Sequence, residues 1–321
     1  MALAHDPYPP ETFNPAQREV LDVIGAPRSS WPTFRPELRA ELRDELDQEL
    51  GPVVERLDDE PATLYLSKHT LSSVLGCEAR FLHEDAAGFP GWSVPLARGT
   101  VAHKAIELSA HTRGGCEPLR LVDEAMARLE QAETSLADWL QKLPEIERAE
   151  LRAVVNDQVA KFLEAWPPLQ VAWRPVTEST WRIELHAARI VLLGRADLTL
   201  QRADGLVARK VVVDLKTGGF APSHLDDLRF YALLETLRLG TPPRLVATYY
   251  LDSGRFVPEA VTEPMLWSAV ARVVGAATRI VELRRHPAEP VYRPGPACRW
   301  CPLADGCEAA RDAGTTSDGW G

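Results

Sequence analysis

Three closely spaced apolar segments in the second half of the chain most constrain its fold. Residues 176–186, 189–200 and 206–215 are rich in β-branched and apolar side chains, and Asp204-Gly205 supplies turn chemistry between the second and the third segment. The pattern predicts three strands, of which the last two form a hairpin. Two more strands are predicted at 244–251 and 255–261, and two helices at 223–239 and 264–285. The second half of the chain therefore predicts an α/β core.

The first half of the chain has a mainly helical pattern. Residues 1–35 are rich in proline and turn formers and predict an irregular lead-in. Beyond Pro36, leucines recur at every fourth position as far as Gly51-Pro52, which predicts an amphipathic helix that has an acidic outer face and ends at that pair. Four more helices are predicted from periodicity and capping signals, at 67–77, 98–112, 117–143 and 145–166. A helical N-terminal part thus precedes the α/β core.

The composition narrows the classes of protein that fit the chain. No apolar stretch approaches the roughly 20 residues that span a bilayer, and the N-terminus lacks a basic region followed by an apolar core. We therefore expect a soluble, cytoplasmic protein with no membrane partner. The net charge of −10 argues at first sight against nucleic acid as a partner. Residues 37–60, however, hold ten acids and only three arginines, so most of the negative charge is local.

The predicted hairpin carries charged side chains within an otherwise apolar pattern. Asp214 and Lys216 lie two residues apart and therefore face the same side of their strand. A hairpin register that sets Asp197 opposite Asp214 brings their Cβ atoms to roughly 4.5–5.5 Å from each other. Two such carboxylates repel each other and lose hydration, and a divalent cation relieves both costs. Oxygen ligands of this kind suit Mg²⁺ or Mn²⁺.

Two further residues extend this hypothetical site. Beside a metal, Lys216 would orient or deprotonate an attacking water, or stabilise the charge that develops on a phosphate. His103 and Glu107 lie one helical turn apart on one face, and an imidazole can complete a carboxylate metal site. Each residue alone also fits an ordinary structural role, as a strand end, a lysine that reaches solvent or a surface histidine. The combination favours metal-dependent hydrolysis of a phosphodiester.

An ordered set of short motifs resembles the RecB-type nucleases of the PD-(D/E)XK superfamily. The family pattern is a His after a Gly-x-x-x motif, an Asp after Gly-x-x, an acid-x-Lys and a Gln-x-x-x-Tyr helix. The first three motifs are matched by Gly99 with His103, by Gly194 with Asp197 and by Asp214 with Lys216. The fourth departs, because Tyr231 is present but Asp227 stands where the family has glutamine. An ionised carboxylate cannot donate a hydrogen bond as an amide does, which puts the family's nucleic-acid contact in doubt unless Arg229 compensates.

The resemblance implies a fold and a set of roles. The fold is an α/β core of the restriction-endonuclease type, with a mixed central sheet, flanking helices and a helical N-terminal part. Metal ligands are implied at His103, Asp197, Asp214 and the Leu215 carbonyl, and catalytic roles at Asp197, Asp214, Lys216 and Tyr231. Tyr231 also fits plain core packing. We expect three parts: a lead-in with the acidic helix at 1–62, a nuclease domain at 63–310 and a mobile tail at 311–321. The nuclease domain contains a helical insertion at about 117–166.

Closely spaced cysteines near the C-terminus predict a second metal centre. Cys298, Cys301 and Cys307 form a C-x₂-C-x₅-C motif, Cys77 is the candidate fourth ligand, and Cys116 is its competitor. Thiolate sites of this kind hold zinc or an iron–sulfur cluster, and spacing alone does not separate the two. A lone cysteine before the His motif, together with the C-terminal trio, resembles the iron–sulfur branch of the family. That branch includes the AddB nuclease domain and the small CRISPR-adaptation nucleases. The resemblance implies a structural [4Fe–4S] cluster on Cys77 and the trio that staples the chain ends, with Cys116 free.

These inferences together predict a DNA nuclease that depends on Mg²⁺ or Mn²⁺. We expect an exonuclease acting on single-stranded DNA or on DNA ends, in DNA repair, recombination or CRISPR and phage defence. One alternative is a catalytically weak or inactive DNA-binding scaffold with the nuclease fold. Another is a zinc-stapled protein with no nucleic-acid role. The acidic N-terminal helix offers a surface for a protein partner.

Overall fold

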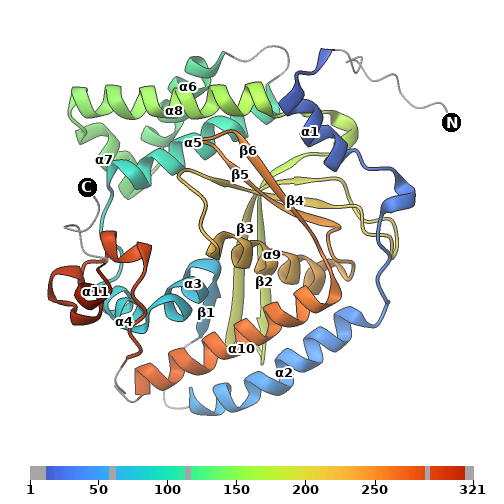
Figure 1. Cartoon of the computed structure of the whole chain (residues 1–321), viewed down its shortest axis with the longest axis vertical. Helices are drawn as coiled ribbons and strands as arrows, with labels where there is room; N and C mark the ends of the chain where they lie inside the picture. The colour runs from blue at the N-terminus through green and yellow to red at the C-terminus, as the bar shows by residue number, and fades with distance from the viewer. Residues whose placement is uncertain (1–11, 58–62, 113–116, 286–289, 315–321) are drawn as a thin grey trace.

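The computed structural model describes residues 12–57, 63–112, 117–285 and 290–314. A six-stranded sheet lies between two layers of helices (Figure 1). The strands are β1 (Leu64–Ser67), β2 (Val176–Leu185), β3 (Ile190–Leu200), β4 (Val211–Lys216), β5 (Leu245–Tyr250) and β6 (Arg255–Ala260). The predicted α/β core with a mixed central sheet and flanking helices is confirmed.

The long strand β3 organises the sheet. Along one edge it pairs antiparallel with β2 over nearly its whole length. The other edge is shared, since β1 pairs parallel with residues 190–193 and β4 pairs antiparallel with residues 198–200. Beyond β4, β5 is parallel and β6 antiparallel, so the sheet is mixed.

A break in strand pairing follows from this arrangement. On the edge shared by β1 and β4, none of the described strands pairs with residues 194–197 of β3. β1 runs parallel to β3 and ends at Ser67 opposite Leu193, whereas β4 runs the other way and ends at Lys216. The C-terminal ends of both strands therefore point into the same gap. We call residues 194–197 and the two converging strand ends the split of the sheet.

Apolar side chains of the helices cover both faces of the sheet. One layer consists of α2 (Leu38–Arg56), α3 (Lys68–Gly76), α9 (Ser223–Leu239) and α10 (Glu263–Arg285), with α4 (Glu78–Ala87) at its end. The other consists of α1 (Pro15–Ile24), α5 (Val94–His111), α6 (Pro118–Glu130), α7 (Ser135–Lys142) and α8 (Glu145–Ala165). Short 3₁₀ turns lie at Arg28–Ser30, Val171–Trp173, Pro296–Trp300 and Ala304–Gly306, and α11 is Glu308–Asp312. None of the described helices combines the length and the apolarity that crossing a bilayer requires.

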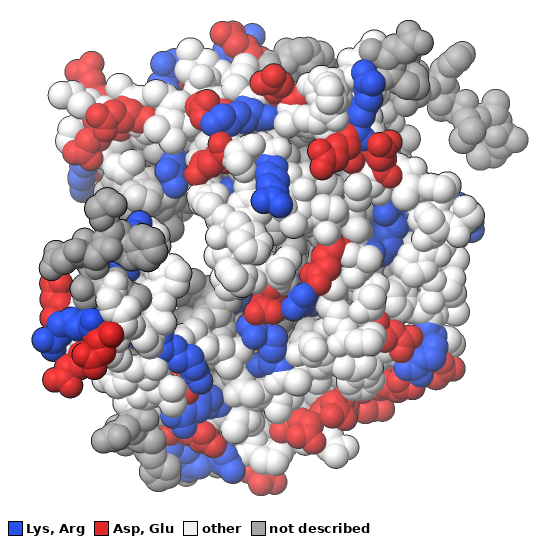
Figure 2. All heavy atoms as spheres, in the orientation of Figure 1, with Lys and Arg blue, Asp and Glu red and all other residues white. Residues whose placement is uncertain are grey.

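The amphipathic helix predicted after Pro36 is present as α2. Its stripe is fully buried against the core, at Leu38, Leu42, Leu46 and Leu50. Its acidic side chains gather along the lower edge of the molecule (Figure 2). The predicted end at Gly51-Pro52 is wrong, because the helix continues to Arg56 and buries Val53. Glycine before proline removes the Cβ that would clash with the proline ring, and Pro52 itself faces solvent.

Two other expectations from the sequence are also wrong. The lead-in contains a helix, α1, which begins with a capping box in which the Asn14 side chain accepts from the Gln17 backbone at 2.9 Å. The single helix expected at 117–143 is two helices, because Thr134 caps a new one with its hydroxyl. The capping residues Asn14 and Thr134 are visible in the sequence. Nearby prolines obscure the first of them, and continuous apolar periodicity obscures the second.

Gly194 lies in the split, and its position predicts a stability effect. A Cβ atom there would lie 2.5 Å from Leu234 Cδ1 and 3.1 Å and 3.2 Å from the rings of Trp181 and Tyr231. We expect Gly194→Ala to lower the free energy of unfolding by about 1–3 kcal/mol through overpacking. Urea denaturation measures the change. Gly275→Ala is the control, because a Cβ in this exposed part of α10 meets nothing within 4 Å and should stabilise the protein slightly. Equal stability of Gly194→Ala and the wild type would disprove the close packing.

Candidate metal centre and catalytic residues

Asp197 closes the split of the sheet with its side chain. Its Oδ2 accepts a hydrogen bond from the Leu215 backbone N–H at 2.7 Å, in place of a strand-to-strand backbone bond. Its Oδ1 lies 3.0 Å from Nδ1 of His103, which α5 contributes from the other side. The single carboxylate therefore joins β3, β4 and α5.

The register of the hairpin agrees with the prediction. Leu198 pairs with Val213 and Leu200 with Val211. Asp197 and Asp214 are thus the next residues opposite each other, one step beyond the last backbone pair, where the strands separate. The structure brings Asp197, Asp214 and His103 to the same split.

Glu178 is a third acid at this place, and the sequence reasoning missed it. It lies opposite Asp197 on β2, because its neighbours Thr177 and Ser179 pair with Leu198 and Ala196. Ligand atoms of His103, Glu178 and Asp197 all lie within 4.8 Å of one another. Burial, and then the charge of Asp197, raise the pKa of Glu178. A shared cation would relieve this repulsion.

The donor atoms fit a divalent metal ion. Two carboxylates and an imidazole are ligands that Mg²⁺ or Mn²⁺ accepts. Two of the buried carboxylate oxygens already lie beside a cationic side chain, since Arg195 Nε is 2.6 Å from Glu178 Oε2 and Lys216 Nζ is 3.1 Å from Asp214 Oδ2. Buried carboxylates need such compensating charge, and a divalent ion could supply more of it. His103, Glu178 and Asp197 could hold the ion, with Asp214 beside them.

Asp214 is fully buried between two lysines. Lys68, the first residue of α3, donates to its Oδ1 at 2.7 Å, and Lys216 Nζ lies 3.1 Å from its Oδ2. Burial alone would raise the pKa of Asp214, but Lys68 and Lys216 lower it to about 2. Asp214 is therefore ionised at neutral pH. No motif of the sequence singles out Lys68; the one signal for it is a scarce residue type directly after a strand that points into the split.

Asp227 holds Lys216 in place. The Lys216 ammonium donates to Asp227 Oδ2 at 3.0 Å, and Asp227 Oδ1 accepts from the Ser72 hydroxyl at 3.0 Å. The residue that departs from the family's glutamine is thus a partner of the lysine. Arg229, the candidate to compensate, instead pairs with Glu259 on β6 at 2.7 Å.

Tyr231 packs in the core and touches the site. Its ring lies 5.2 Å from that of Trp181, edge to face, and the Lys68 ammonium lies 4.9 Å from its centroid. Burial raises the pKa of Tyr231, so that the phenol stays neutral. Glu107, one turn from His103, pairs with Lys104 at 2.9 Å and is not among the clustered metal-ligand candidates.

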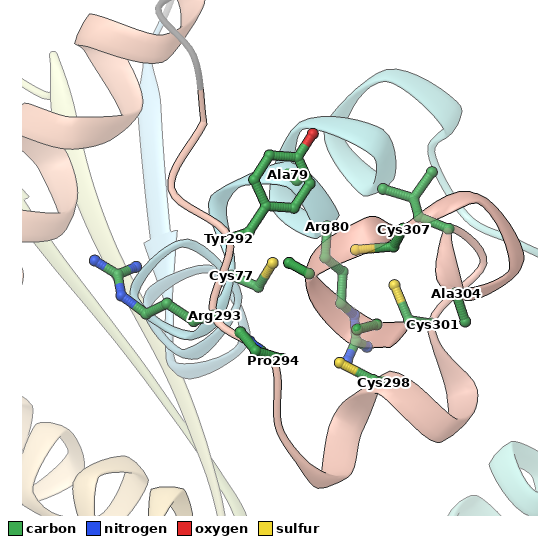
Figure 3. Close-up of a pocket in the computed structure, with 13 residues that line it drawn as sticks. Cys77, Ala79, Arg80, Tyr292, Arg293, Pro294, Cys298, Cys301, Ala304 and Cys307 are labelled. Atoms are coloured by element: carbon green, nitrogen blue, oxygen red, sulfur yellow. The ribbon is translucent and has the colours of Figure 1, made fainter. Parts of the chain in front are cut away.

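The four cysteines predicted to bind a cluster line one cavity. Cys77 lies between α3 and α4, while Cys298, Cys301 and Cys307 come from the C-terminal segment, and their sulfur atoms face a common space (Figure 3). Among the described residues, no three of these sulfurs lie within 4.8 Å of one another. Cys116 lies outside the described residues.

Protein contacts already join the segments that carry these cysteines. Glu78 follows Cys77 and is almost fully buried. Its carboxylate accepts from Arg279 on α10 at 2.7 Å and from the Val291 backbone at 2.8 Å. Arg293 in turn donates to the Leu75 carbonyl at 3.3 Å. The contacts of the buried Glu78 carboxylate thus help to hold the four thiols near one another, in addition to any group that they bind.

A mixed sheet whose split gathers several acids and an acid-x-Lys strand is the arrangement expected of a nuclease core. In agreement, the sequence model of the PD-(D/E)XK nuclease superfamily matches residues 65–308. The chain belongs to the PD-(D/E)XK nuclease superfamily.

Two solved structures that resemble the chain share little sequence with it. A provisionally assigned exonuclease from Eubacterium rectale shares 14% sequence identity, with 77% of this chain and 87% of that chain covered and a TM-score of 0.44. The protein SSO0001 shares 15% identity, with 84% and 94% covered and a TM-score of 0.34. Among curated proteins, none matches the chain significantly.

The clustered ligand atoms predict how the chain binds metal. We expect Glu178→Gln to weaken Mn²⁺ binding by more than about tenfold, because even outer partners of metal ligands typically contribute 10- to 100-fold. Isothermal titration calorimetry measures the affinity. Glu107→Gln is the matched control on the neighbouring helix and should bind Mn²⁺ as the wild type does. Unchanged affinity in Glu178→Gln would remove this residue from the metal centre.

Proposed function

We propose that the chain is a deoxyribonuclease that hydrolyses phosphodiester bonds at the split of the sheet and depends on Mg²⁺ or Mn²⁺. The observation that carries the proposal is the cluster of His103, Glu178 and Asp197 beside the buried Asp214–Lys216 pair. A divalent ion bound there would supply the positive charge that polarises a phosphate and favours attack by water. Asp214, which Lys68 and Lys216 contact, would be a further ligand of the same ion.

Lys216 has the surroundings of a fixed cation. It lies within 3.1 Å of Asp214 and 3.0 Å of Asp227, and its side chain is mostly buried. These two carboxylates hold the ammonium in place. In this geometry Lys216 would stabilise the charge that develops on the phosphate oxygens, rather than take a proton from water.

The substrate that we propose is single-stranded DNA or a DNA end, processed exonucleolytically. An open groove runs from Lys68 between α3 and the β2–β3 hairpin, with lining residues that include Arg182, Arg195 and Tyr231. Cationic and aromatic side chains along a groove suit a single strand, whose backbone is charged and whose bases stack. DNA repair, recombination and defence against foreign DNA are processes that use such an activity, and the acidic face of α2 would be available to a protein partner.

For the cysteine cavity, we propose a structural [4Fe–4S] cluster, as in the iron–sulfur branch of the superfamily. A single tetrahedral zinc with bonds of 2.3 Å would hold its sulfurs about 3.8 Å apart. The cysteine sulfurs are spread more widely than this, with no three of those described within 4.8 Å. A cubane attaches each thiolate to a different iron and needs the wider spacing. The cluster would fasten the C-terminal segment to the α3–α4 junction.

A second candidate function is a DNA-binding scaffold with weak or no cleavage. Two features favour it: Asp227 replaces the family's glutamine, and Lys68 already neutralises part of the charge on Asp214. Retention of every other charged member of the site favours the nuclease.

Cleavage of labelled DNA tests the nuclease proposal. We expect Asp214→Asn and Lys216→Met to lower the rate in Mn²⁺ by more than about 100-fold, because both remove charge stabilisation at the reacting phosphate. Asp226→Asn and Lys161→Met are matched controls, since Asp226 pairs with Arg272 on α10 and Lys161 pairs with Asp157 on α8, and neither pair includes a residue of the site. Equal cleavage by all five proteins would refute the assignment. Binding without cleavage by the wild type, in both Mg²⁺ and Mn²⁺, would support the scaffold.

Iron content tests the cluster. We expect an anaerobic preparation to be brown, and Cys298→Ser to lose most of its iron because the cluster loses a ligand. Cys116→Ser should keep wild-type iron and colour. Elemental analysis and the visible spectrum measure both. A colourless wild-type protein with one bound zinc would overturn the proposal.

A further inference from the structure

A cluster of three aromatic rings lies beside the acid-x-Lys strand. Tyr250 ends β5 and pairs in register with Lys216, the last residue of β4, so both side chains leave the same face of the sheet. The ring of Phe220 lies 6.2 Å from that of Tyr250, and the ring of His224 lies 5.7 Å from it. The cluster is therefore a direct neighbour of Lys216.

One ring of the cluster is open to solvent, although the ring behind it is fixed. Tyr250 is 3% exposed, and its hydroxyl lies 3.1 Å from His224 Nδ1. Phe220, in contrast, is 58% exposed. An aromatic ring that is supported by a buried ring and is otherwise open can stack with a further planar group.

Backbone contacts hold Phe220 in this position. The segment 217–222 joins β4 to α9, and Gly218 turns it with a φ of +120°, a conformation that L side chains rarely adopt. Directly after Phe220, the Ala221 N–H donates to His224 Nδ1 at 3.4 Å, and the His224 N–H donates back to the Ala221 carbonyl at 3.0 Å. The exposed ring is thus carried by a turn that is anchored to the first turn of α9.

The order of the strands places the cluster on the flank of the site opposite the groove. The groove that starts at Lys68 lies along β2 and β3. β4, with Asp214 and Lys216, follows β3 in the sheet, and β5, with Tyr250, follows β4. A DNA strand that leaves the groove and crosses Lys216 would therefore meet Phe220 next.

The chemistry of the cluster suits a nucleobase. Phe220 has no charge and no hydrogen-bonding group, so it offers nothing to a phosphate. The bases of a single strand are unpaired planar rings, and stacking on aromatic side chains is a main source of affinity in proteins that bind single strands. Lys216 next to it carries the positive charge that suits the phosphate of the same strand.

We propose that Phe220 is a specificity-determining residue, which stacks on the nucleobase next to the cleaved phosphate on the side away from the groove. Tyr250 and His224 support its ring and its turn. Because a base in an intact duplex is paired and stacked on its neighbours, this contact selects an unpaired strand or a frayed end. The inference rests on the proposed nuclease function and adds the residue that distinguishes a single strand from a duplex.

Cleavage of DNA strands that lack one base tests the contact, because the cleaved bond reports where each strand lies in the site. Single strands with one abasic nucleotide at successive positions are cleaved in Mn²⁺, and the rate at each bond is measured. For the wild type, we expect a fall of roughly 5- to 150-fold at one bond next to the abasic nucleotide, the range that loss of one base stack produces. Phe220→Leu should be slower by a similar factor on unmodified strands, with no further fall at the abasic position. Leucine keeps an apolar side chain in the turn but has no aromatic face.

Two other variants serve as controls. Phe220→Trp keeps an aromatic face and should retain the wild-type response to the missing base. Ile146→Ala removes an exposed apolar side chain from α8, in the other helical layer, and should cleave every strand as the wild type does.

Two results would overturn the inference while the nuclease proposal stands. One is wild-type cleavage that does not respond to a missing base at any position, and the other is a Phe220→Leu protein that remains as sensitive to it as the wild type. If the wild type cleaves no strand, the nuclease proposal itself fails, and the same strands are compared by fluorescence anisotropy. A loss of affinity for abasic strands that disappears in Phe220→Leu would then still support the stacking contact, whereas equal affinities would refute it.

Discussion

The interruption of strand pairing along one edge of β3 is the constraint on which the rest of this structure depends. β1 and β4 share that edge, and on it none of the described strands pairs with the four residues of β3 that lie between them. Backbone groups left in this way must find other partners, and Asp197 supplies one by accepting from the Leu215 N–H. The same interruption lets the ends of β1 and β4 converge, so that Lys68 and Asp214 meet although they are 146 residues apart. The candidate site thus lies where the sheet is incomplete.

Charge balance explains how so many ionisable groups can lie in a nearly buried place. A buried carboxylate is tolerated only with compensating charge or donors. Here the charges alternate: Lys68 contacts Asp214, Asp214 contacts Lys216, and Lys216 contacts Asp227. On the other side, His103 contacts Asp197, and Arg195 contacts Glu178 at 2.6 Å. The lysines position the acids, and the acids in turn hold the lysines, which gives the site a defined geometry before a substrate binds.

The sequence predicted what depends on local pattern and missed what depends on tertiary pairing. The leucine stripe of α2 was predicted from periodicity and the register of the β3–β4 hairpin from the turn chemistry at Asp204-Gly205, and both are confirmed. Glu178 belongs to the β2–β3 pair, whose register no short motif fixes, and Lys68 matters only because β1 joins the sheet beside β4. Asp227 looked like a defect when compared with a family motif, and its pairing with Lys216 could only be seen in the folded chain.

The central claim is that the split of the sheet is the metal centre of a PD-(D/E)XK nuclease. Anomalous diffraction from crystals soaked in Mn²⁺ tests it most directly, because the ion is located without reference to activity. The account predicts a manganese peak in contact with Asp197 and His103, within reach of Glu178 and Asp214. Manganese bound elsewhere, with Asp197 still accepting from Leu215 and His103 and no peak between the strands, would contradict it.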